Sequence, residues 1–353
     1  MNVTYLIVGT GLAGLCMAHF CQRNNKSFVM IDNGQRTSSK VAGGMFNPVV
    51  LKRFTAIWES QAQLELANKF YPETERLLGE FFYHKLPIYR KFASIEEQNN
   101  WFLACDNPLT TPFLNDRLRQ ENFLHLPAEF GFGEVYDTGY LDVHLFVTSY
   151  QKYLREQKLL LNTSFEYDSM EISGTEIKYR DISAQHIIFA EGFSMHQNPF
   201  FNYLPLDGTK GELLYVRIPD LKLQPIVKSG VFIIPMGNDI YKVGATYNWQ
   251  DKTDNPTKEG YNELTKGLEK LINCPYEIVK HLAGVRPTVK DRRPLVGAHY
   301  KFKNIHILNG LGTRGVLLAP YLADKLIRNI ENGVPLDKNI DVVRYYRKLQ
   351  LIK

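Results

Sequence analysis

Residues 3–14 read VTYLIVGTGLAG, and this stretch decides the fold. Val3–Val8 is a short run of β-branched, aromatic and other apolar residues, which predicts a buried strand. A G-x-G-x-x-G loop follows it, and apolar residues then recur at helical spacing over Leu12–Gln22. Glycines in such a loop permit a tight turn and let backbone N–H groups approach a pyrophosphate at the start of the helix.

The next strand completes the motif. Ser27–Ile31 is a second apolar run that ends at Asp32. This places a carboxylate about 20 residues past the loop, where an acidic residue grips ribose hydroxyls. The succession of strand, loop, helix and strand predicts dinucleotide binding; the alternative is a glycine turn that serves only close packing.

The rest of the chain predicts two interleaved domains. We expect further strands at 186–190, 213–218, 231–234, 240–246 and 305–308, and helices at 54 to about 78, 143–154, 259–271 and 316–332. The fold class is α/β, with a Rossmann-type domain interleaved with an α+β domain built on an antiparallel or mixed sheet. The predicted boundaries are 1–52, 141–203 and 284–353 for the first domain, and 53–140 and 204–283 for the second.

Composition narrows the class of protein. The 353 residues are 44% hydrophobic and 22% charged, with a net charge of +5, which is ordinary for a soluble globular protein. The four cysteines form no C-x-x-C pair, no apolar run reaches the length of a membrane span, and the histidines lack metal-ligand spacing. We therefore expect a cytoplasmic protein without a metal site or a membrane span.

Three later motifs add chemistry. Residues 42–48 read AGGMFNP, and two adjacent glycines let a backbone approach a flat ligand. Residues 309–315 read NGLGTRG between a strand and a helix, which is a second anion site of the helix-start kind. Two such loops suit a longer ligand such as FAD. In GVRPTVKDRRPLVG (284–297), Arg286 precedes a proline, is held extended and can present its fork to a carboxylate, whereas Arg292 and Arg293 read as surface residues.

With these motifs, the chain resembles the D-amino-acid oxidase superfamily of FAD-dependent oxidoreductases, and within it glycine oxidase and sarcosine oxidase-like proteins. The resemblance implies that the first loop and the second strand hold the adenosine diphosphate of FAD, and that residues 190–192 lie near its phosphates or ribose. It also implies that residues 43–45 lie along the isoalloxazine and that residues 310–316 face the pyrimidine edge of the flavin. The implied cofactor-binding residues are Gly9, Gly11, Leu12, Ala13, Gly14, Asp32, Asn33, Gly43, Gly44, Met45, Ala190, Glu191, Gly192, Gly310, Gly312, Thr313, Arg314, Gly315 and Val316.

The same resemblance implies the reaction and its residues. A hydride would pass from the α-carbon of an amino acid or N-substituted glycine to flavin N5, and the imine would hydrolyse. Arg286 would grip the substrate carboxylate, with Phe232, Thr246 and Arg314 also at the substrate. Lys242 would be a second catalytic residue beside the flavin that assists oxygen; the alternative is a solvent-facing strand lysine.

Two departures from the family refine this picture. Phe232 stands where glycine oxidase has a tyrosine, which argues against glycine and for a bulkier or more apolar substrate. Thr288 follows Pro287 where some relatives attach FAD through a cysteine, so we expect non-covalent FAD.

Other functions stay open. The chain could be a tRNA wobble-uridine oxidase that removes a carboxymethyl group, for which the basic tail Arg344–Lys353 would be the RNA contact, although a solvated terminal helix is favoured. It could also be a non-catalytic flavin-binding protein. The expected partners are a small amine or amino acid and oxygen or another electron acceptor; nucleic acid is not expected but is not excluded.

Overall fold

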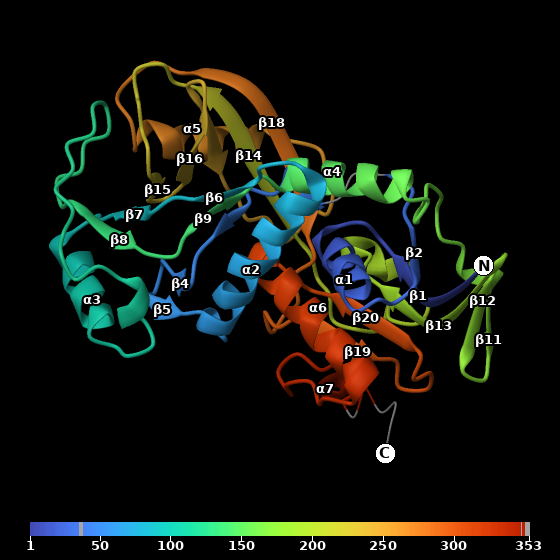
Figure 1. The fold of residues 1–353 in the computed structure, drawn as a ribbon. Coiled ribbons are helices and arrows are strands. Elements are labelled where there is room, and N and C mark those ends of the chain that lie inside the picture. Colours follow the sequence, from blue (N-terminus) through green and yellow to red (C-terminus); the bar gives the residue numbers. More distant parts are fainter. Residues whose placement is uncertain (35–37, 347, 350–353) are drawn as a thin grey trace.

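The strand that opens the chain, β1 (Asn2–Val8), lies inside an eight-stranded sheet. The computed structural model describes residues 1–34, 38–346 and 348–349, and Figure 1 shows its arrangement. β1 pairs in parallel with β2 on one side and with β13 on the other. The parallel strands are β2 (Phe28–Ile31), β10 (Leu160–Leu161), β13 (Ile182–Phe189) and β20 (Ile305–Asn309), and antiparallel strands are β11 (Met170–Ser173), β12 (Glu176–Tyr179) and β19 (Leu295–Ala298).

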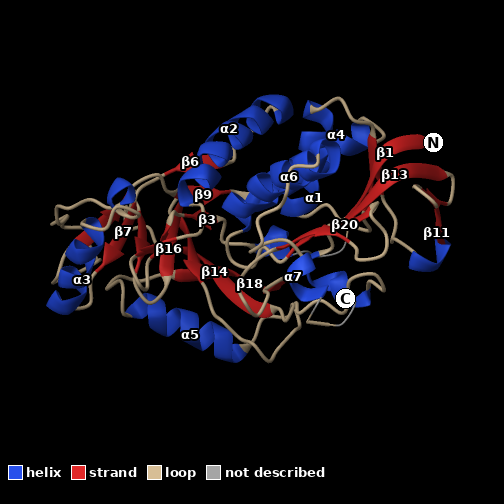
Figure 2. Ribbon diagram, turned by 90° about the horizontal axis from the view of Figure 1, so that it is seen from below, coloured by secondary structure: helices blue, strands red, loops and turns tan. Residues whose placement is uncertain are grey.

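Alternate residues of β1 face opposite sides of this sheet, and helices cover one of these sides. Tyr5 and Ile7 pack into the core formed with α1, α4 and α6, whereas Leu6 and Val8 pack against the segments that follow β13 and against the C-terminal part. Figure 2 shows α1, α4 and α6 gathered on the same side of β1 and β13. The helices are α1 (Leu12–Arg23), α4 (Val143–Glu156) and α6 (Gly315–Asn332). This arrangement confirms the predicted Rossmann-type architecture.

The second sheet is mixed, as predicted, and all of its neighbouring strands are antiparallel except β15 and β7. One face packs on α5 (Lys258–Glu269), which buries Val243 and Ile233 against Leu264. The opposite face turns Phe232 and Ile234 toward the core shared with the first sheet. Its strands, in spatial order, are β18 (Glu277–Arg286), β14 (Thr209–Arg217), β17 (Ile240–Gly244), β16 (Phe232–Gly237), β15 (Ile226–Lys228), β7 (Ile88–Lys91) and β8 (Phe132–Val135).

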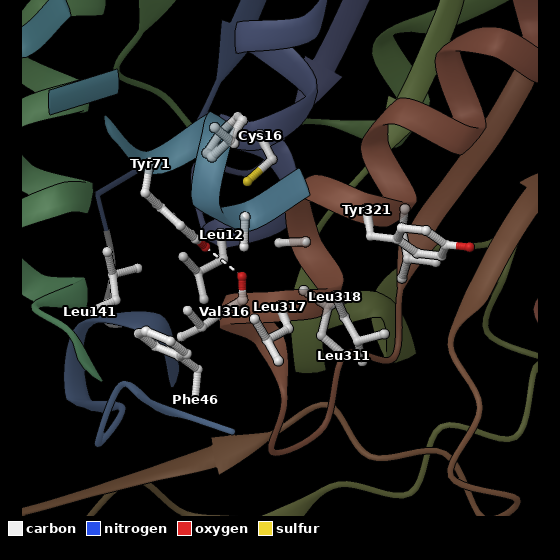
Figure 3. Packing of buried hydrophobic residues seen from close by; sticks show 14 of the residues in the cluster. Leu12, Cys16, Phe46, Tyr71, Leu141, Leu311, Val316, Leu317, Leu318 and Tyr321 are labelled. Atoms are coloured by element: carbon white, nitrogen blue, oxygen red, sulfur yellow. Dashed lines mark hydrogen bonds between the residues drawn. The ribbon is translucent and has the colours of Figure 1, made fainter. Parts of the chain in front are cut away.

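Shorter elements join the two sheets. The helix α2 (Ser60–Leu78) packs on α6, and the Tyr71 hydroxyl donates a hydrogen bond of 2.6 Å to the carbonyl of Val316 (Figure 3). The remaining elements are β3 (Met45–Phe46), β4 (Val49–Val50), β5 (Thr55–Ala56), β6 (Tyr83–Lys85), β9 (Gly139–Leu141), α3 (Ile95–Cys105), α7 (Val343–Tyr346) and the 3-10 helices η1 (Ser38–Val41), η2 (Thr111–Phe113), η3 (Tyr167–Ser169) and η4 (Gly192–Gln197).

Several predicted element boundaries were wrong, among them two that matter for the site. The helix expected from Phe54 begins only at Ser60, because Phe54 is buried against Trp101 with ring centroids 5.3 Å apart and Thr55–Ala56 pairs as β5. The strand expected over 240–246 ends at Gly244, so the alternation of faces does not extend to Thr246. The division into two domains stays a prediction; strands of the first sheet come from 2–31, 160–189 and 295–309, and those of the second from 88–135 and 209–286.

Candidate cofactor and substrate site

A cavity of about 780 Å³ opens at the carboxyl ends of the parallel strands. Val8 and Ile31, the last residues of β1 and β2, line it together with Asn309 at the end of β20. In doubly wound sheets the ligand crevice lies outside these strand ends. The cavity therefore occupies the position that the opening motif predicts for a dinucleotide.

The glycine loop brings backbone, not side chains, to the cavity wall. A Cβ on Gly9, whose φ is +102°, would lie 2.5 Å from the carbonyl oxygen of Ala190, and one on Gly14 would lie 1.9 Å from that of Gly9. Gly11 caps α1 without a side-chain hydrogen bond, and Gly11, Leu12 and Ala13 line the cavity; the N–H of Leu12 donates a 3.2 Å hydrogen bond to the Ser39 hydroxyl. These features fit a pyrophosphate. Gly14 is not in the described wall and serves packing inside the loop.

Asp32 holds the loop and faces the cavity at the same time. Its carboxylate accepts hydrogen bonds of 2.7 Å from the backbone N–H groups of Thr10 and Gly34. A carboxylate offers about four lone-pair sites, so acceptor capacity remains for ribose hydroxyls. Asn33 lines the cavity beside it.

Ala190, Glu191 and Gly192 also line the cavity. The Glu191 carboxylate accepts from the Tyr167 hydroxyl at 2.5 Å and from the Asn198 amide at 2.7 Å, and burial raises its pKa. The carbonyl of Gly192 accepts a 2.8 Å hydrogen bond from the Asn309 side chain. The hydrogen bonds of Glu191 to Tyr167 and Asn198 thus hold this part of the cavity wall in place. The hydrogen bond to Gly192 connects the ends of β13 and β20.

The 43–45 segment lies outside the described cavity wall. A Cβ on Gly43 would meet the Phe232 ring at 2.8 Å, and one on Gly44 would meet the Leu141 carbonyl oxygen at 2.0 Å. Met45 pairs with Tyr140 between β3 and β9. Both glycines are therefore required by the packing of this chain itself, and the Phe232 ring lies where Gly43 and the second sheet meet.

The segment before α6 brings a second helix start next to the first. A Cβ on Gly315 would lie 3.0 Å from a methyl carbon of Leu12, the first residue of α1. The Gly312 N–H donates 3.0 Å to the carbonyl of Pro287, which ties this segment to the residue after Arg286. Asn309 and Leu311 line the cavity, whereas the other predicted residues of this segment lie outside its described wall: Gly310, Gly312, Thr313, Arg314, Gly315 and Val316. Arg314 is the N-cap residue of α6, and its side chain makes no capping hydrogen bond; α1 also begins without one.

Arg286 ends β18 with a guanidinium held by neutral groups. It donates to the carbonyls of Lys210 and Thr246 at 3.3 and 3.2 Å, lies 4.6 Å from the ring centroid of Tyr247, and covers Gly211 so closely that a Cβ there would be 1.8 Å from Nη2. Burial lowers its pKa. Within the described part of the chain no carboxylate oxygen lies within 4 Å of it. Two carbonyls and the Tyr247 ring thus hold the guanidinium in place, and Arg286 itself lies outside the described cavity wall.

Thr246 supports Arg286 through its backbone. The Thr246 hydroxyl accepts a 2.9 Å hydrogen bond from the N–H of Glu212, and its carbonyl accepts from Arg286. Its side chain is buried, and the predicted contact of Thr246 with the substrate stays a prediction.

Lys242 is buried, with 1% of its surface exposed, so the alternative of a solvent-facing strand lysine is wrong. Its ammonium donates to the carbonyl of Gly43 at 3.4 Å and lies 5.3 Å from the ring centroid of Tyr215. Burial lowers the pKa of Lys242 to about 8, and the charge of Asp142 opposes this shift. A buried lysine whose pKa is lowered in this way is a candidate functional group.

The sequence did not predict one segment that lines the cavity. Residues 252–255 line it, and we call 249–257 the strap. Lys210, 1% exposed, reaches into the strap and donates 2.5 Å to Asp251 and 2.5 Å to the carbonyl of Asn255, holding the pKa of Asp251 at about 2. Lys252 bonds back to Asp207 at 3.0 Å. The strap is polar and lacks regular structure, so no pattern in the sequence pointed to it.

Two kinds of site are absent from the described residues. No group of three or more metal-ligating side chains occurs there. No helix in residues 1–34, 38–346 and 348–349 has the length and apolar character needed to cross a bilayer. The four cysteines are free thiols.

Comparison with known proteins agrees with this geometry. The model of the family described as FAD dependent oxidoreductase matches residues 4–328. Glycine oxidase of Bacillus subtilis is 23% identical over 92% of this chain and 93% of its own length. The tRNA 5-methylaminomethyl-2-thiouridine biosynthesis bifunctional protein MnmC of Idiomarina loihiensis is 25% identical over 44% of this chain and 27% of its own. The crystal structure of iminodiacetate oxidase from Chelativorans sp. BNC1 superimposes with a TM-score of 0.77 at 18% identity, covering 95% and 98% of the two chains.

Proposed function

The chain belongs to the family of FAD-dependent oxidoreductases, and we propose that it oxidises an amino acid or an N-substituted glycine at its carbon–nitrogen bond. The observation that carries the proposal is Arg286, a fixed guanidinium without an acidic partner among the described residues. It lies on β18, whose residues Ala283, Gly284 and Val285 line the cofactor cavity. A substrate carboxylate bound there would be held next to the flavin end of FAD. The similarity to glycine oxidase supports this substrate class.

The residues of the cavity would hold FAD without a covalent bond. The loop 9–14 and the start of α1 would face the pyrophosphate, Asp32 the ribose, and the segment before α6 the flavin pyrimidine edge. Thr288, not cysteine, follows Pro287. When bound, FAD supplies the acceptor for a hydride from the substrate α-carbon to flavin N5, and water hydrolyses the resulting imine to ammonia or an amine and a carbonyl product.

The chain itself contributes positioning and charge. Arg286 orients the carboxylate, and the carbonyls of Lys210 and Thr246 keep its fork in place. Phe232 presents an apolar ring without a hydroxyl, which favours a substrate larger or more apolar than glycine. Lys242 provides a buried positive charge near Gly43, and with oxygen as the acceptor this charge would stabilise the negative charge that oxygen gains.

An anaerobic flavin-reduction screen tests the proposal. It should span D-amino acids, proline, glycine, N-methylglycine and carboxymethylaminomethyl nucleosides, with the absorption of the flavin as the signal. We expect at least one amino acid or N-substituted glycine to bleach the flavin, and exposure to air to show whether oxygen restores it. A yellow protein that no amine reduces would instead be a non-catalytic flavin-binding protein.

A second candidate is the oxidation of a carboxymethylaminomethyl group on tRNA. The similarity to the bifunctional tRNA-modifying protein favours it. The predicted RNA contact is the tail Arg344–Lys353, of which residues 347 and 350–353 lie outside the described residues. Arg344 is engaged with Asp291 at 3.3 Å and with the carbonyl of Pro294 at 2.8 Å, which ties it to the protein. Retention of tRNA binding after removal of 347–353 would locate any RNA contact elsewhere.

The same features support a proposal for the cellular location and the partners of the protein. Free thiols and the family chemistry support a cytoplasmic enzyme that meets a small amine or amino acid and then oxygen or another electron acceptor. Fractionation of the source cells with antibody detection tests the location.

A further inference from the structure

The groups that hold the guanidinium of Arg286 are joined to the strap. The carbonyls of Lys210 and Thr246 accept hydrogen bonds from it at 3.3 and 3.2 Å, and the ring centroid of Tyr247 lies 4.6 Å away. Thr246 and Tyr247 lie between the end of β17 and the strap, and Asn248 connects them to it. These three contacts therefore come from the residues that enter the strap and from the strand β14 beside them.

Lys210 holds the start and the middle of the strap. Its backbone N–H donates 2.9 Å to the carbonyl of Asn248, and its carbonyl accepts 3.0 Å from the N–H of Asn248. The Asn248 side chain accepts in turn from the N–H of Asp251 at 3.0 Å. The buried ammonium of Lys210 donates to Asp251 and to the carbonyl of Asn255, both at 2.5 Å. The carbonyl that accepts from Arg286 thus belongs to the residue that fixes the strap.

Glu212 holds the far end of the strap. Its buried carboxylate accepts from the backbone N–H of Thr257 at 2.9 Å and from the Thr257 hydroxyl at 2.7 Å. Its own N–H donates 2.9 Å to the Thr246 hydroxyl, and its carbonyl accepts 3.2 Å from the Thr246 N–H. Lys210 and Glu212 are alternate residues of β14, so their side chains project from one face of the sheet. They anchor the strap and also support Arg286, Lys210 directly and Glu212 through Thr246.

The strap also forms part of the wall of the cofactor cavity. Residues 252–255 line the same cavity as Gly11 and Asp32. A ligand stabilises the arrangement that it binds more tightly, so a cofactor that contacts the strap favours the strap in its present position. A displaced strap would deprive the Lys210 ammonium, 1% exposed, of its two strap partners, which is unfavourable for a buried charge. The position of the strap and the support of Arg286 are therefore parts of one arrangement.

We propose that Lys210 and Glu212 are positioning residues that couple the strap to Arg286. Cofactor in the cavity fixes Arg286 for the substrate carboxylate, and a carboxylate on Arg286 in turn holds the strap in the cavity wall. The inference rests on the proposed function and adds a coupling between its two binding sites. Such coupling is reciprocal, so each ligand raises the affinity for the other by the same factor.

Hydrogen exchange of the strap measures this coupling. Peptides that cover 249–257 are followed by mass spectrometry in wild-type holoenzyme with and without saturating propionate, a carboxylate that lacks the amine to be oxidised. We expect propionate to slow the exchange of the strap about fivefold, and the apoprotein to exchange it faster than the holoenzyme. Arg286→Ala should abolish the effect of propionate, because the strap then has no link to the carboxylate.

Asp251→Asn weakens the coupling from outside both sites, because Asp251 contacts Lys210 but is not in the described cavity wall. With FAD saturating, the dissociation constant of propionate, read from the flavin absorption, should rise about fivefold. KM for a carboxylate substrate should rise similarly, while kcat stays within about twofold. Lys210→Met should give the same pattern with a larger rise. Glu259→Gln removes an exposed charge just after the strap and is the matched control; it should leave these constants unchanged.

The outcomes are distinct. Propionate that perturbs the flavin without changing strap exchange, or that binds Asp251→Asn and Lys210→Met as tightly as wild type, would overturn the inference and leave the proposed function intact. Slower strap exchange that persists in Arg286→Ala would also overturn it, since the carboxylate would then act elsewhere. If propionate does not perturb the flavin and no amine reduces it, the proposed function fails and the inference fails with it.

Discussion

Arg286 illustrates what one residue's surroundings reveal about its role. Its position before Pro287 was enough to predict a fixed fork, because a residue before proline is held extended. The carbonyls of Lys210 and Thr246 that accept from its N–H groups lie 76 and 40 residues away in sequence, so no local pattern could have found them. Arg293, which the sequence predicted at the surface, has its guanidinium 5.7 Å from the ring centroid of Trp58, a contact that no local pattern shows.

Replacing Arg286 tests the carboxylate contact. Arg286→Ala should leave a folded yellow protein whose kcat/KM for amino-acid substrates falls about a hundredfold, since a bidentate charged pair contributes about 3 kcal/mol. Arg286→Lys should recover only part of the loss. Stopped-flow reduction of the flavin measures both. Unchanged rates with every carboxylate substrate would remove Arg286 from the substrate site.

Lys242 allows a test that needs no substrate. Burial lowers its pKa from 10.5 to about 8, so the folded state binds fewer protons than the unfolded state between these values. The shift corresponds to about 3 kcal/mol of destabilisation while the lysine is charged, below pH 8, and this cost declines as pH rises toward 10.5. Lys242→Met should therefore raise the free energy of unfolding at pH 7, and by less at pH 10. A pH-independent difference, from urea titrations at several pH values, would contradict the assigned pKa.

The same substitution addresses the reaction with oxygen. If oxygen is the acceptor, Lys242→Met should slow reoxidation far more than reduction, and wild-type reoxidation should slow as pH rises through about 8 because Lys242 loses its proton. Stopped-flow traces of the two half-reactions separate these effects. Equal reoxidation in mutant and wild type would limit Lys242 to a structural role.

At the scale of elements, the opening strand, loop and helix were predictable because period and glycine spacing agree locally. The start of α2 was not, since the burial of Phe54 against Trp101 overrides the helical pattern before Ser60. The face of β17 that carries Lys242 was predicted from alternation, but its burial was not, because the sequence does not show that both faces of the second sheet are covered.

Asp32 links the loop to the end of β2, and its substitution tests both contacts. Asp32→Asn preserves shape but places an amide N–H₂ where backbone N–H groups of Thr10 or Gly34 now donate. We expect FAD affinity to fall about tenfold to a hundredfold, as for the loss of one charge-assisted hydrogen bond or more. Fluorescence of released flavin measures the dissociation constant, and an unaltered constant would assign Asp32 to loop structure alone.

The strap provides a second element-scale test. Lys210→Met removes the ammonium that joins Asp251 and the carbonyl of Asn255, so the strap should leave its place over the cavity more often and FAD should dissociate about tenfold faster. Lys258→Met, at an exposed site just after the strap, is the control. The rate of flavin release into an apoprotein trap reports the result. A normal release rate in Lys210→Met would separate the strap from cofactor retention.

At the scale of the whole molecule, we expect FAD to bind without a covalent bond and to stabilise the native state. Heat or acid should release intact FAD and leave a colourless polypeptide, because Thr288 offers no thiol at the attachment position. Free FAD at a hundred times its dissociation constant should stabilise the native state by about 2.7 kcal/mol, seen as a higher Tm in calorimetry. Flavin that stays with the precipitated chain would show that the attachment is covalent.

The residues that line the cofactor cavity are synthesised at different times. Gly9, Gly11 and Asp32 precede Asn309 and Leu311 in the chain, so a ribosome makes them earlier. During synthesis the loop 9–14 is therefore complete before the part of the cavity wall that Asn309 and Leu311 form. A nascent chain stalled before residue 305 lacks β20 and α6, the strand that extends the sheet beside β13 and the helix that packs on α1. Capture of FAD is therefore a late event in biogenesis, and ribosome-bound chains should become yellow only once α6 has emerged from the exit tunnel.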